Sequence, residues 1–366
     1  MTLWFYIVRR FLMNVLKVEV AVFFLILLVN ATEELRFLSG KDATSQTALW
    51  LVAASLPKLM MTTFPLVVLL GSLFTFIGLA RSSELVVMRA SGVSALRILI
   101  VPAITAVILG IIAVTIFNPI VAATIRKNTE IRESFSSGGR SQLSVSREGI
   151  WLRQANPNGH MIIQARASSG QGVVLFNVRF HEFSQDSVLT RRIEAQRAHL
   201  NDGEWQLFQA TQWRFLDRNL DETTDVRPFD ELSLPTDLTP EDILESFDAP
   251  EKISVWNTPS FIRQLEASGF TAVSHKIYLQ SQLALPLLLV AMVMVGSVFA
   301  LRPSRFGNTG LMVLLAIMSG FLTYTVTNIA ISLGEAQQIP INLAAWAPAV
   351  AMLLLALTAV LHLEDG

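Results

Sequence analysis

Few side chains in this sequence have the types and spacings that catalysis requires. The five histidines are dispersed, without H-E-x-x-H or another spacing that would bring two imidazoles to one metal ion. There is no cysteine, which excludes a disulfide framework, a thiolate nucleophile and a Cys-ligated zinc site. Neither a G-x-S-x-G elbow nor a G-x-x-x-x-G-K-[ST] phosphate loop occurs. We therefore expect no catalysis, no ATP hydrolysis and no cofactor or metal in this chain.

Basic side chains remain as candidates, because ammonium and guanidinium groups at a membrane surface bind lipid phosphates. Two groups of them follow the first and third apolar stretches of the chain: Arg36 and Lys41, then Arg126, Lys127 and Arg132. Alternatively, these are solvated loop charges or determinants of membrane topology. Glu33 and Glu34 lie beside the first group and would weaken its attraction for an anion.

The segment RSSELVVMRASG at 81–92 predicts a short helix that could dock onto a partner. Ser82 or Ser83 would cap its start, and Gly92 would end it. A negative charge is favourable in a first helical turn and a positive charge near the last. The candidate docking residues are Glu84, Leu85, Met88 and Arg89, with Val87 also on the apolar side. The alternative is a loop helix that lies among the lipid headgroups.

The chain that carries these residues is built from two unlike materials. Of its 366 residues, 52% are apolar and only 16% are charged, whereas about a quarter are charged in a typical soluble domain. Of the 28 basic and 29 acidic residues, 37 lie between Pro119 and His275. One single-core globule is therefore excluded, and the net charge of −1 argues against a nucleic-acid partner.

Six apolar stretches are long enough to cross a bilayer, which takes about 20 helical residues. They cover approximately 11–31, 56–80, 98–116, 277–301, 310–333 and 341–361. Their only charges are Lys17, Glu19 and Lys58, and a charge at a helix centre costs about 2.5–3.5 kcal/mol. We expect a membrane α-helical protein with six transmembrane helices in a 3+3 arrangement.

Basic residues in short loops predict the orientation of the spans. One side would carry Arg9, Arg10, Arg81, Arg89, Arg97, Arg302 and Arg305. The opposite side has only Arg36, Lys41 and Lys58. We expect a multi-pass protein of a bacterial inner membrane, with both termini in the cytoplasm and the large insert in the periplasm.

The insert has the period-two pattern of half-buried strands from about 141 to 235. The pattern puts Val174, Phe176, Val178 and Phe180 on one face, and it groups Trp205, Leu207, Trp213 and Phe215 on another. We expect a β jelly roll or sandwich. A short helix at 258–268, capped by Thr258 and stopped by Gly269, would lead to the fourth span.

The expected domains follow from these patterns. Residues 1–125 would form transmembrane helices 1–3, with the short cytoplasmic helix at 82–92. Residues 126–270 would form the periplasmic β domain with its flanking helix, and residues 271–366 would form transmembrane helices 4–6.

Three segments together resemble the lipopolysaccharide export permeases of the LptF/LptG family, most closely its LptG type: SELVVMRASG at 83–92, SLPK at 55–58 and GIWL at 149–152. The likeness covers nearly the whole chain, including the order of spans and insert. It implies one half of the membrane part of an ABC transporter, paired with an LptF-like subunit and driven by an LptB-like ATPase dimer that holds ATP and Mg²⁺. Lipopolysaccharide would pass from the inner membrane to periplasmic β jelly-roll domains, and then to LptC, LptA and the outer membrane.

The resemblance also implies roles for particular residues. The 82–92 helix would enter a groove of the ATPase, with Glu84 at the position of the family's glutamate. The basic residue that LptG proteins carry at the end of the first span is replaced here by Asn30. The expected acyl-chain contacts are Phe24, Leu27, Phe64 and Leu69. In the β domain, Phe176, Val178, Trp205 and Trp213 either line a lipid groove or form ordinary core.

Two other functions remain open at this level. One is a permease of another ABC system, such as one that releases lipoproteins. The other is a membrane-anchored periplasmic assembly module that works without an ATPase.

Overall fold

The computed structural model describes residues 2–41, 43–135, 142–146, 149–156, 159–168, 174–184, 188–201, 203–215, 223–236, 249–301 and 309–365. They form two compact units. The helical unit comprises Met1–Arg132, Glu251–Trp256 and Val273–Gly366, and the β unit comprises Glu133–Pro250 and Asn257–Ala272. The third span continues as a helix through Ser134, so the β unit begins later than position 126.

Six helices of the described residues are long and apolar enough to cross a membrane, three on each side of the insert. The helical elements are α1 (Thr2–Leu38), α2 (Ser45–Arg81), α3 (Glu84–Ala90), α4 (Ala95–Ile112), the π-helix η1 (Ala113–Phe117), α5 (Asn118–Ser134), α8 (Val273–Leu301), α9 (Thr309–Glu335) and α10 (Ile341–Asp365). The third span is continuous through α4, η1 and α5. The expected helical membrane protein with an inserted β domain is confirmed.

Small residues bring α2 and α8 into close contact. A Cβ atom at Gly296 would lie 2.6 Å from the Leu69 carbonyl oxygen and 3.0 Å from the Leu73 nitrogen. Beside it, the Ser72 hydroxyl donates a hydrogen bond of 2.9 Å to the Val293 carbonyl oxygen. Close backbone approach of this kind holds helices together in lipid, where apolar side chains gain little by leaving one apolar medium for another.

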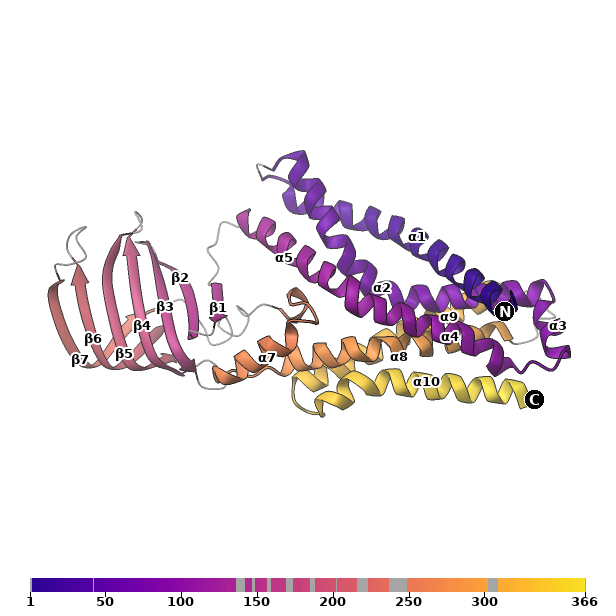
Figure 1. Ribbon diagram of the computed structural model, residues 1–366. Helices are drawn as coiled ribbons and strands as arrows, with labels where there is room; N and C mark the ends of the chain where they lie inside the picture. Colours follow the sequence, from indigo (N-terminus) through magenta and orange to yellow (C-terminus); the bar gives the residue numbers. More distant parts are fainter. Residues whose placement is uncertain are drawn as a thin grey trace. The chain divides into compact units, whose positions relative to one another are not determined.

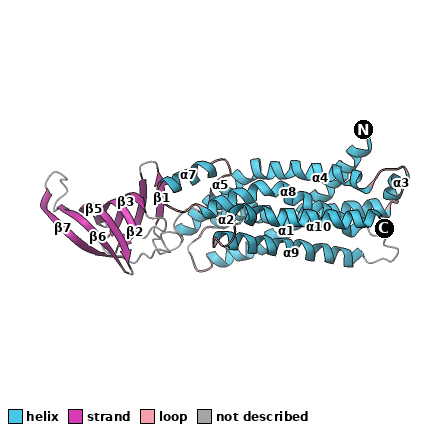
Figure 2. Cartoon of the chain, turned by 90° about the horizontal axis from the view of Figure 1, so that it is seen from below, coloured by secondary structure: helices cyan, strands magenta, loops and turns pink. Residues whose placement is uncertain are grey.

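One end of the helical unit gathers the features expected on the cytoplasmic side. Figures 1 and 2 place the start of α1, the end of α10 and α3 at the same end of the bundle. Arg81 and Arg89 flank or lie on α3, and Arg97 begins the next span. Arg302 and Arg305 lie outside the described residues.

The segment Glu251–Trp256 packs onto the π-helical turn of the third span. The Asn118 side-chain amide donates a hydrogen bond of 2.7 Å to the Tyr278 hydroxyl on α8, and its Oδ1 atom accepts one of 2.8 Å from the Val255 nitrogen. The Trp256 indole donates to the Thr115 carbonyl oxygen at 3.1 Å. The Asn118 side chain and the Thr115 carbonyl oxygen of η1 thus fix this segment to the third span.

The β unit contains one antiparallel sheet whose seven strands follow each other in sequence order (Figure 1). They are β1 (Gln142–Ser146), β2 (Gly149–Asn156), β3 (Gly159–Ser168), β4 (Val174–Ser184), β5 (Leu189–Asn201), β6 (Glu204–Phe215) and β7 (Thr223–Pro235). The described strands therefore form a single meander rather than two separate sheets. A 3₁₀ turn, η2 (Pro250–Lys252), and the helix α7 (Thr258–Ala267) follow it.

The expected helix at 258–268 is present, with Asn257 rather than Thr258 at its N-cap position. Thr258 is already the first helical residue, followed by proline, which the first turn tolerates. Gly269 adopts φ +84° and ends the helix as expected.

The period-two pattern is broken along one line across the sheet. Buried side chains are three residues apart there, as in Leu175 and Val178 on β4, or Leu207 and Ala210 on β6. Asn177 and Gln209 adopt left-handed backbone with φ 49° and 51°. We call this line of residues the kink line. It comprises the residues that the register leaves without a paired partner on the neighbouring strand: Arg166, Asn177, Gln196 and Gln209.

The kink corrects the expected faces. Phe176 is 37% exposed, whereas Val178 and Phe180 are buried. Likewise, Trp205 is fully buried, but Trp213 is only half-buried, on the other side of the flip at Gln209. A left-handed residue rotates the strand, so alternation cannot be carried through it.

The close contact at Gly296 predicts sensitivity to a larger side chain. We expect Gly296→Val to destabilise the protein by about 1–3 kcal/mol, because the new atoms overlap the α2 backbone. Gly310→Val is the control, since a Cβ there meets nothing within 4 Å. Equal thermal unfolding midpoints of the two variants in detergent would contradict this packing.

Candidate functional site

The short helix α3 is anchored by one face and exposed on the other. Leu85 and Met88 are each 6% exposed and belong to the core of the helical unit. Val86 and Val87 are 66% and 67% exposed, and Arg89 is exposed as well. The structure thus corrects the expected apolar side: Val87 points away from the bundle, and Leu85 and Met88 hold the helix in place.

The start of α3 is not capped by a serine. Ser83 occupies the N-cap position with φ 58°, and its side chain makes no capping hydrogen bond. The Ser82 hydroxyl instead lies 2.6 Å from the Glu84 carboxylate and 2.9 Å from the Gly78 carbonyl oxygen, so that its one proton serves either acceptor. Gly92 follows the helix with φ +86°, as expected for its end.

Glu84 connects α3 to the first span. Its Oε1 atom accepts hydrogen bonds from Arg10 at 3.0 Å and from the Tyr6 hydroxyl at 3.3 Å. Arg10 also donates to the Tyr6 hydroxyl at 2.6 Å. Partial burial favours the neutral carboxyl, but the hydrogen bonds from Ser82, Arg10 and Tyr6 and the charge of Arg10 outweigh it and lower the pKa of Glu84. The group is therefore a carboxylate at neutral pH.

A glycine on α2 makes room for this connection. A Cβ atom at Gly78 would lie 2.8 Å from the Arg10 guanidinium. The side chain of Arg10 therefore passes over α2 at Gly78, where α2 has no side chain in the way, and reaches Glu84. Three elements, α1, α2 and α3, meet at this single carboxylate.

At the opposite end of α1, two of the expected phosphate-binding residues lie around one aromatic ring. The Lys41 ammonium lies 3.6 Å from the centre of the Phe37 ring, and the Arg132 guanidinium lies 4.5 Å from it. Arg132 also forms a 2.7 Å ion pair with Glu34, whose side chain is only 2% exposed. Its Nε atom donates to Asn128 at 2.9 Å. We call Glu34, Phe37, Lys41, Asn128 and Arg132 the α1–α5 cluster.

The other expected phosphate-binding residues lie outside this cluster. Arg36 and Arg126 are exposed, and Lys127 is exposed in a 3.0 Å ion pair with Glu130 on the same helix. Arg132 is the most constrained of the five, because a buried carboxylate already neutralises it. A phosphate that contacts Arg132 would have to compete with Glu34.

Asn30, at the position where the resemblance implies a basic residue, packs inside the bundle. It is 4% exposed and donates to the Ser55 hydroxyl at 2.6 Å and to the Val52 carbonyl oxygen at 3.4 Å. These bonds fasten α1 to α2. The side chain has no surface left for a ligand.

The expected acyl-chain residues differ in accessibility. Phe24 is 62% exposed on α1, and Leu27 is half-buried on the same helix. Phe64 packs against the core with part of its surface accessible. Leu69 is fully buried where α2 meets α8, which assigns it to helix packing and corrects its expected role.

Sequence patterns did not single out several of these site residues. Tyr6, Phe37 and Asn128 are ordinary residues at helix ends, and their roles follow from contacts between distant segments. The spacing of Glu34 and Phe37, one helical turn apart on α1, is a signal that was available, whereas Lys41 lies in the turn after the helix. Within the described residues, no cluster of three or more histidine, aspartate or glutamate side chains is placed to hold a metal ion.

The fold and these sites define a class of protein: a multi-span helical membrane protein with a soluble β domain between two groups of three spans. The model of the family described as lipopolysaccharide export system permease LptF/LptG matches residues 5–362. The chain therefore belongs to the LptF/LptG family.

Its similarity to individual members points to the LptG type. The chain is 24% identical over 307 residues to the lipopolysaccharide export system permease protein LptG of Escherichia coli K12, which covers 83% of this chain and 82% of that one. It is 25% identical over 277 residues to the LptG protein of Haemophilus influenzae, with 75% and 74% covered.

The buried carboxylate of the α1–α5 cluster gives a testable contrast. We expect Glu34→Gln to accelerate amide exchange at residues 34–41 about tenfold, because the ion pair that holds this helix end is lost. Glu33→Gln removes an exposed charge one residue away and is the matched control. Similar exchange rates in the two variants would show that the pair does not hold α1.

Proposed function

We propose that this chain is one permease subunit of an ATP-driven exporter that withdraws lipopolysaccharide from the inner membrane and passes it to a periplasmic bridge. The observation that carries this proposal is the geometry of α3 in a chain of the LptF/LptG family. The helix lies between the second and third spans, is anchored to the core and presents an exposed apolar pair. Such a helix could bind a partner protein through its exposed valines and transmit the partner's movement to the bundle through its buried side.

The energetics explain why the lipid needs a machine. Burying an acyl chain is worth about 0.8 kcal/mol per CH₂ group, so a chain of about a dozen carbons costs about 10 kcal/mol to expose to water. A lipid with several chains does not leave the bilayer unaided. An apolar cavity between two permease subunits would replace the membrane contacts, and ATP-driven closure would expel the lipid in one direction.

The partner at α3 would be an LptB-like ATPase dimer that holds ATP and Mg²⁺. This chain would supply no catalytic group, in keeping with its missing phosphate loop. Val86, Val87 and Arg89 would contact the ATPase, while Leu85 and Met88 transmit the movement to the bundle. Glu84 would pass the same movement to α1 through Arg10.

At the other end, the cationic groups would contact the phosphates of the lipid headgroup. Arg36, Arg126 and Lys127 are exposed and accessible from the water. Lys41 and Arg132 would join them when Glu34 releases its arginine. Phe24 and Leu27, on the accessible face of α1, would contact acyl chains, with Phe64 on the neighbouring helix.

The remaining assignments follow from the family and from the distribution of basic residues. The second permease subunit would be LptF-like. LptC and LptA would receive the lipid in the periplasm, where the β unit would lie. Both termini and α3 would be cytoplasmic, because Arg10, Arg81 and Arg89 lie at their end of the bundle.

The exposed valines give the first test of this proposal. We expect Val86→Asp with Val87→Asp to abolish co-purification of the ATPase from mild detergent, because two charges would be buried at the interface. The Val86→Thr, Val87→Thr variant keeps the shape and should retain most of the ATPase. Full retention by the aspartate variant would move the ATPase contact elsewhere.

Glu84 gives a second, separable test. We expect Glu84→Gln and Arg10→Ala to keep the ATPase bound but to reduce the lipopolysaccharide released per ATP, because the connection from α3 to α1 is weakened. Since the pKa of Glu84 is lowered, the carboxylate connection is fully present above the ordinary carboxyl pKa and is lost only as the pH falls through the lowered value. Coupling should therefore be constant from about pH 8 to pH 6. Unchanged coupling in both variants would reduce this contact to a structural role.

A further inference from the structure

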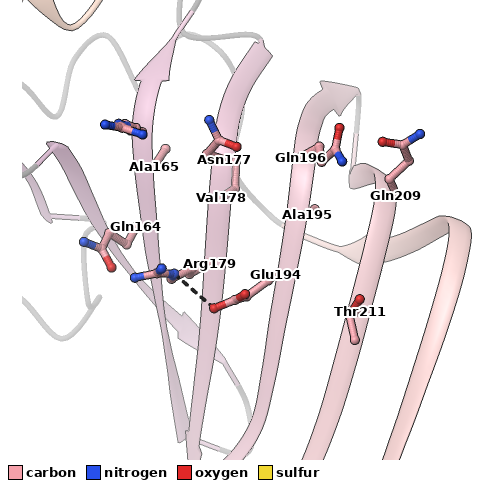
Figure 3. A pocket seen from close by; sticks show the side chains of 11 residues that line it. Gln164, Ala165, Asn177, Val178, Arg179, Glu194, Ala195, Gln196, Gln209 and Thr211 are labelled. Atoms are coloured by element: carbon pink, nitrogen blue, oxygen red, sulfur yellow. Dashed lines mark ion pairs between the residues drawn. The ribbon is translucent and has the colours of Figure 1, made fainter.

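The exposed face of the β sheet contains a pocket of about 530 Å³ that spans β3 to β6 (Figure 3). It lies opposite the face that buries Phe180 and Trp205. One row of polar side chains crosses it: Gln164, Arg179, Glu194 and Thr211. Each lies directly across from the next in the strand register, and Arg179 forms a 3.1 Å ion pair with Glu194.

A second polar row runs beside the first along the kink line. It consists of Arg166, Asn177, Gln196 and Gln209, all of them exposed. Because the strands flip here, two consecutive residues of a strand face outward: Phe176 with Asn177 on β4, and Gln196 with Arg197 on β5. The kink therefore brings Phe176 and Arg197 to the same face of the sheet, beside the second polar row.

Aromatic side chains stacked with arginines border both rows. On one side, Phe176 lies across from Arg197, whose guanidinium is 5.9 Å from the centre of its ring. On the other side, Arg192 lies across from Trp213, with 5.4 Å between guanidinium and ring centre. The floor of the pocket, which also includes Ala165, Val178 and Ala195, thus lies between two pairs of an arginine and a partly accessible aromatic ring that border the pocket.

The amide groups on this floor have unused hydrogen-bonding capacity. Among the described residues, no hydrogen bond engages the side-chain amides of Gln164, Asn177, Gln196 or Gln209. Each of them offers two donors and an accepting oxygen. Water satisfies such groups in the free protein, and a ligand with many hydroxyl groups can replace it.

The backbone of the second row is strained. A left-handed φ is tolerated by asparagine but is uncommon for glutamine, and here both occur at one level of one sheet. Backbone strain of this kind persists where the surrounding structure enforces it, and it clusters at binding sites. The electrostatics are also biased: Arg166 and Arg179 outnumber Glu194, and burial together with the charges of Arg192 and Arg179 lowers the pKa of neighbouring His181.

We propose that this pocket binds the sugar portion of an anionic glycolipid, with amides on its hydroxyl groups, arginines on its phosphate or carboxylate groups, and the flanking aromatic rings against its C–H faces. The inference rests on the proposed function, because the exporter would bring such a lipid past the β unit.

Deacylated lipopolysaccharide tests the pocket without the membrane part of the lipid. The full-length chain in nanodiscs is titrated with this anionic oligosaccharide and, in parallel, with a neutral dextran oligosaccharide, by saturation-transfer NMR and calorimetry. We expect saturable binding of the anionic sugar only. The Arg166→Ala, Gln196→Ala variant should weaken it about tenfold or more, since charge-assisted and amide hydrogen bonds are lost.

Two further variants guard against misfolding. Gln209→Gly removes a lining side chain at a left-handed position that glycine prefers, so weaker binding with an unchanged fold supports the pocket. Arg214→Ala removes an exposed arginine of β6 outside the pocket and should bind normally. Equal affinities across all variants, or equal binding of dextran, would overturn the proposal.

Intact lipopolysaccharide separates this proposal from the proposed function. If the exporter releases intact lipopolysaccharide with ATP but the deacylated sugar does not bind, the pocket proposal fails and the export function stands. If the deacylated sugar binds in the pocket but intact lipopolysaccharide is never released, the export function fails and the sugar site stands.

Discussion

The helical unit depends on the close approach of α2 and α8 at Gly296. In hydrocarbon, helices hold together by backbone proximity and a few interhelical hydrogen bonds, here reinforced by Ser72 and the Val293 carbonyl oxygen. With α2 fixed in this way, α1 packs along it and is fastened by Asn30 at one end and Arg10 at the other. The helix α3 is therefore joined to α1 through Glu84 and Arg10, and to the core of the bundle through Leu85 and Met88.

Six spans and an inserted β domain were predictable, because the cost of charge in hydrocarbon and the turns between strands leave strong signals in a sequence. The position of α3 was predictable too, but its orientation was not. Seven residues are too few for periodicity to decide between Val87 and Met88 as the buried side chain. The bundle decides it, since Leu85 and Met88 complete its core.

Two further features could not be predicted from the sequence, one because it depends on a contact between distant segments and one because it depends on the backbone conformation of single residues. The burial of Glu34 depends on its ion pair with Arg132, nearly a hundred residues later. From the sequence of α1 alone, Glu34 is only a negative charge that weakens the attraction of the nearby basic residues for an anion. The faces of β4 and β6 depend on the left-handed residues Asn177 and Gln209. Neither residue type predicts a change of face within a strand, because glutamine rarely adopts a left-handed backbone and asparagine adopts it in many turns.

The proposed exporter would use ATP hydrolysis by a partner to drive lipopolysaccharide out of the bilayer through this chain and a second permease subunit. The most direct measurement uses proteoliposomes that contain both permeases, the ATPase and lipopolysaccharide, with a soluble periplasmic acceptor outside. We expect transfer of lipopolysaccharide to the acceptor only when ATP is hydrolysed. Transfer at the same rate without ATP, or ATP-dependent release of lipoproteins in place of lipopolysaccharide, would contradict it.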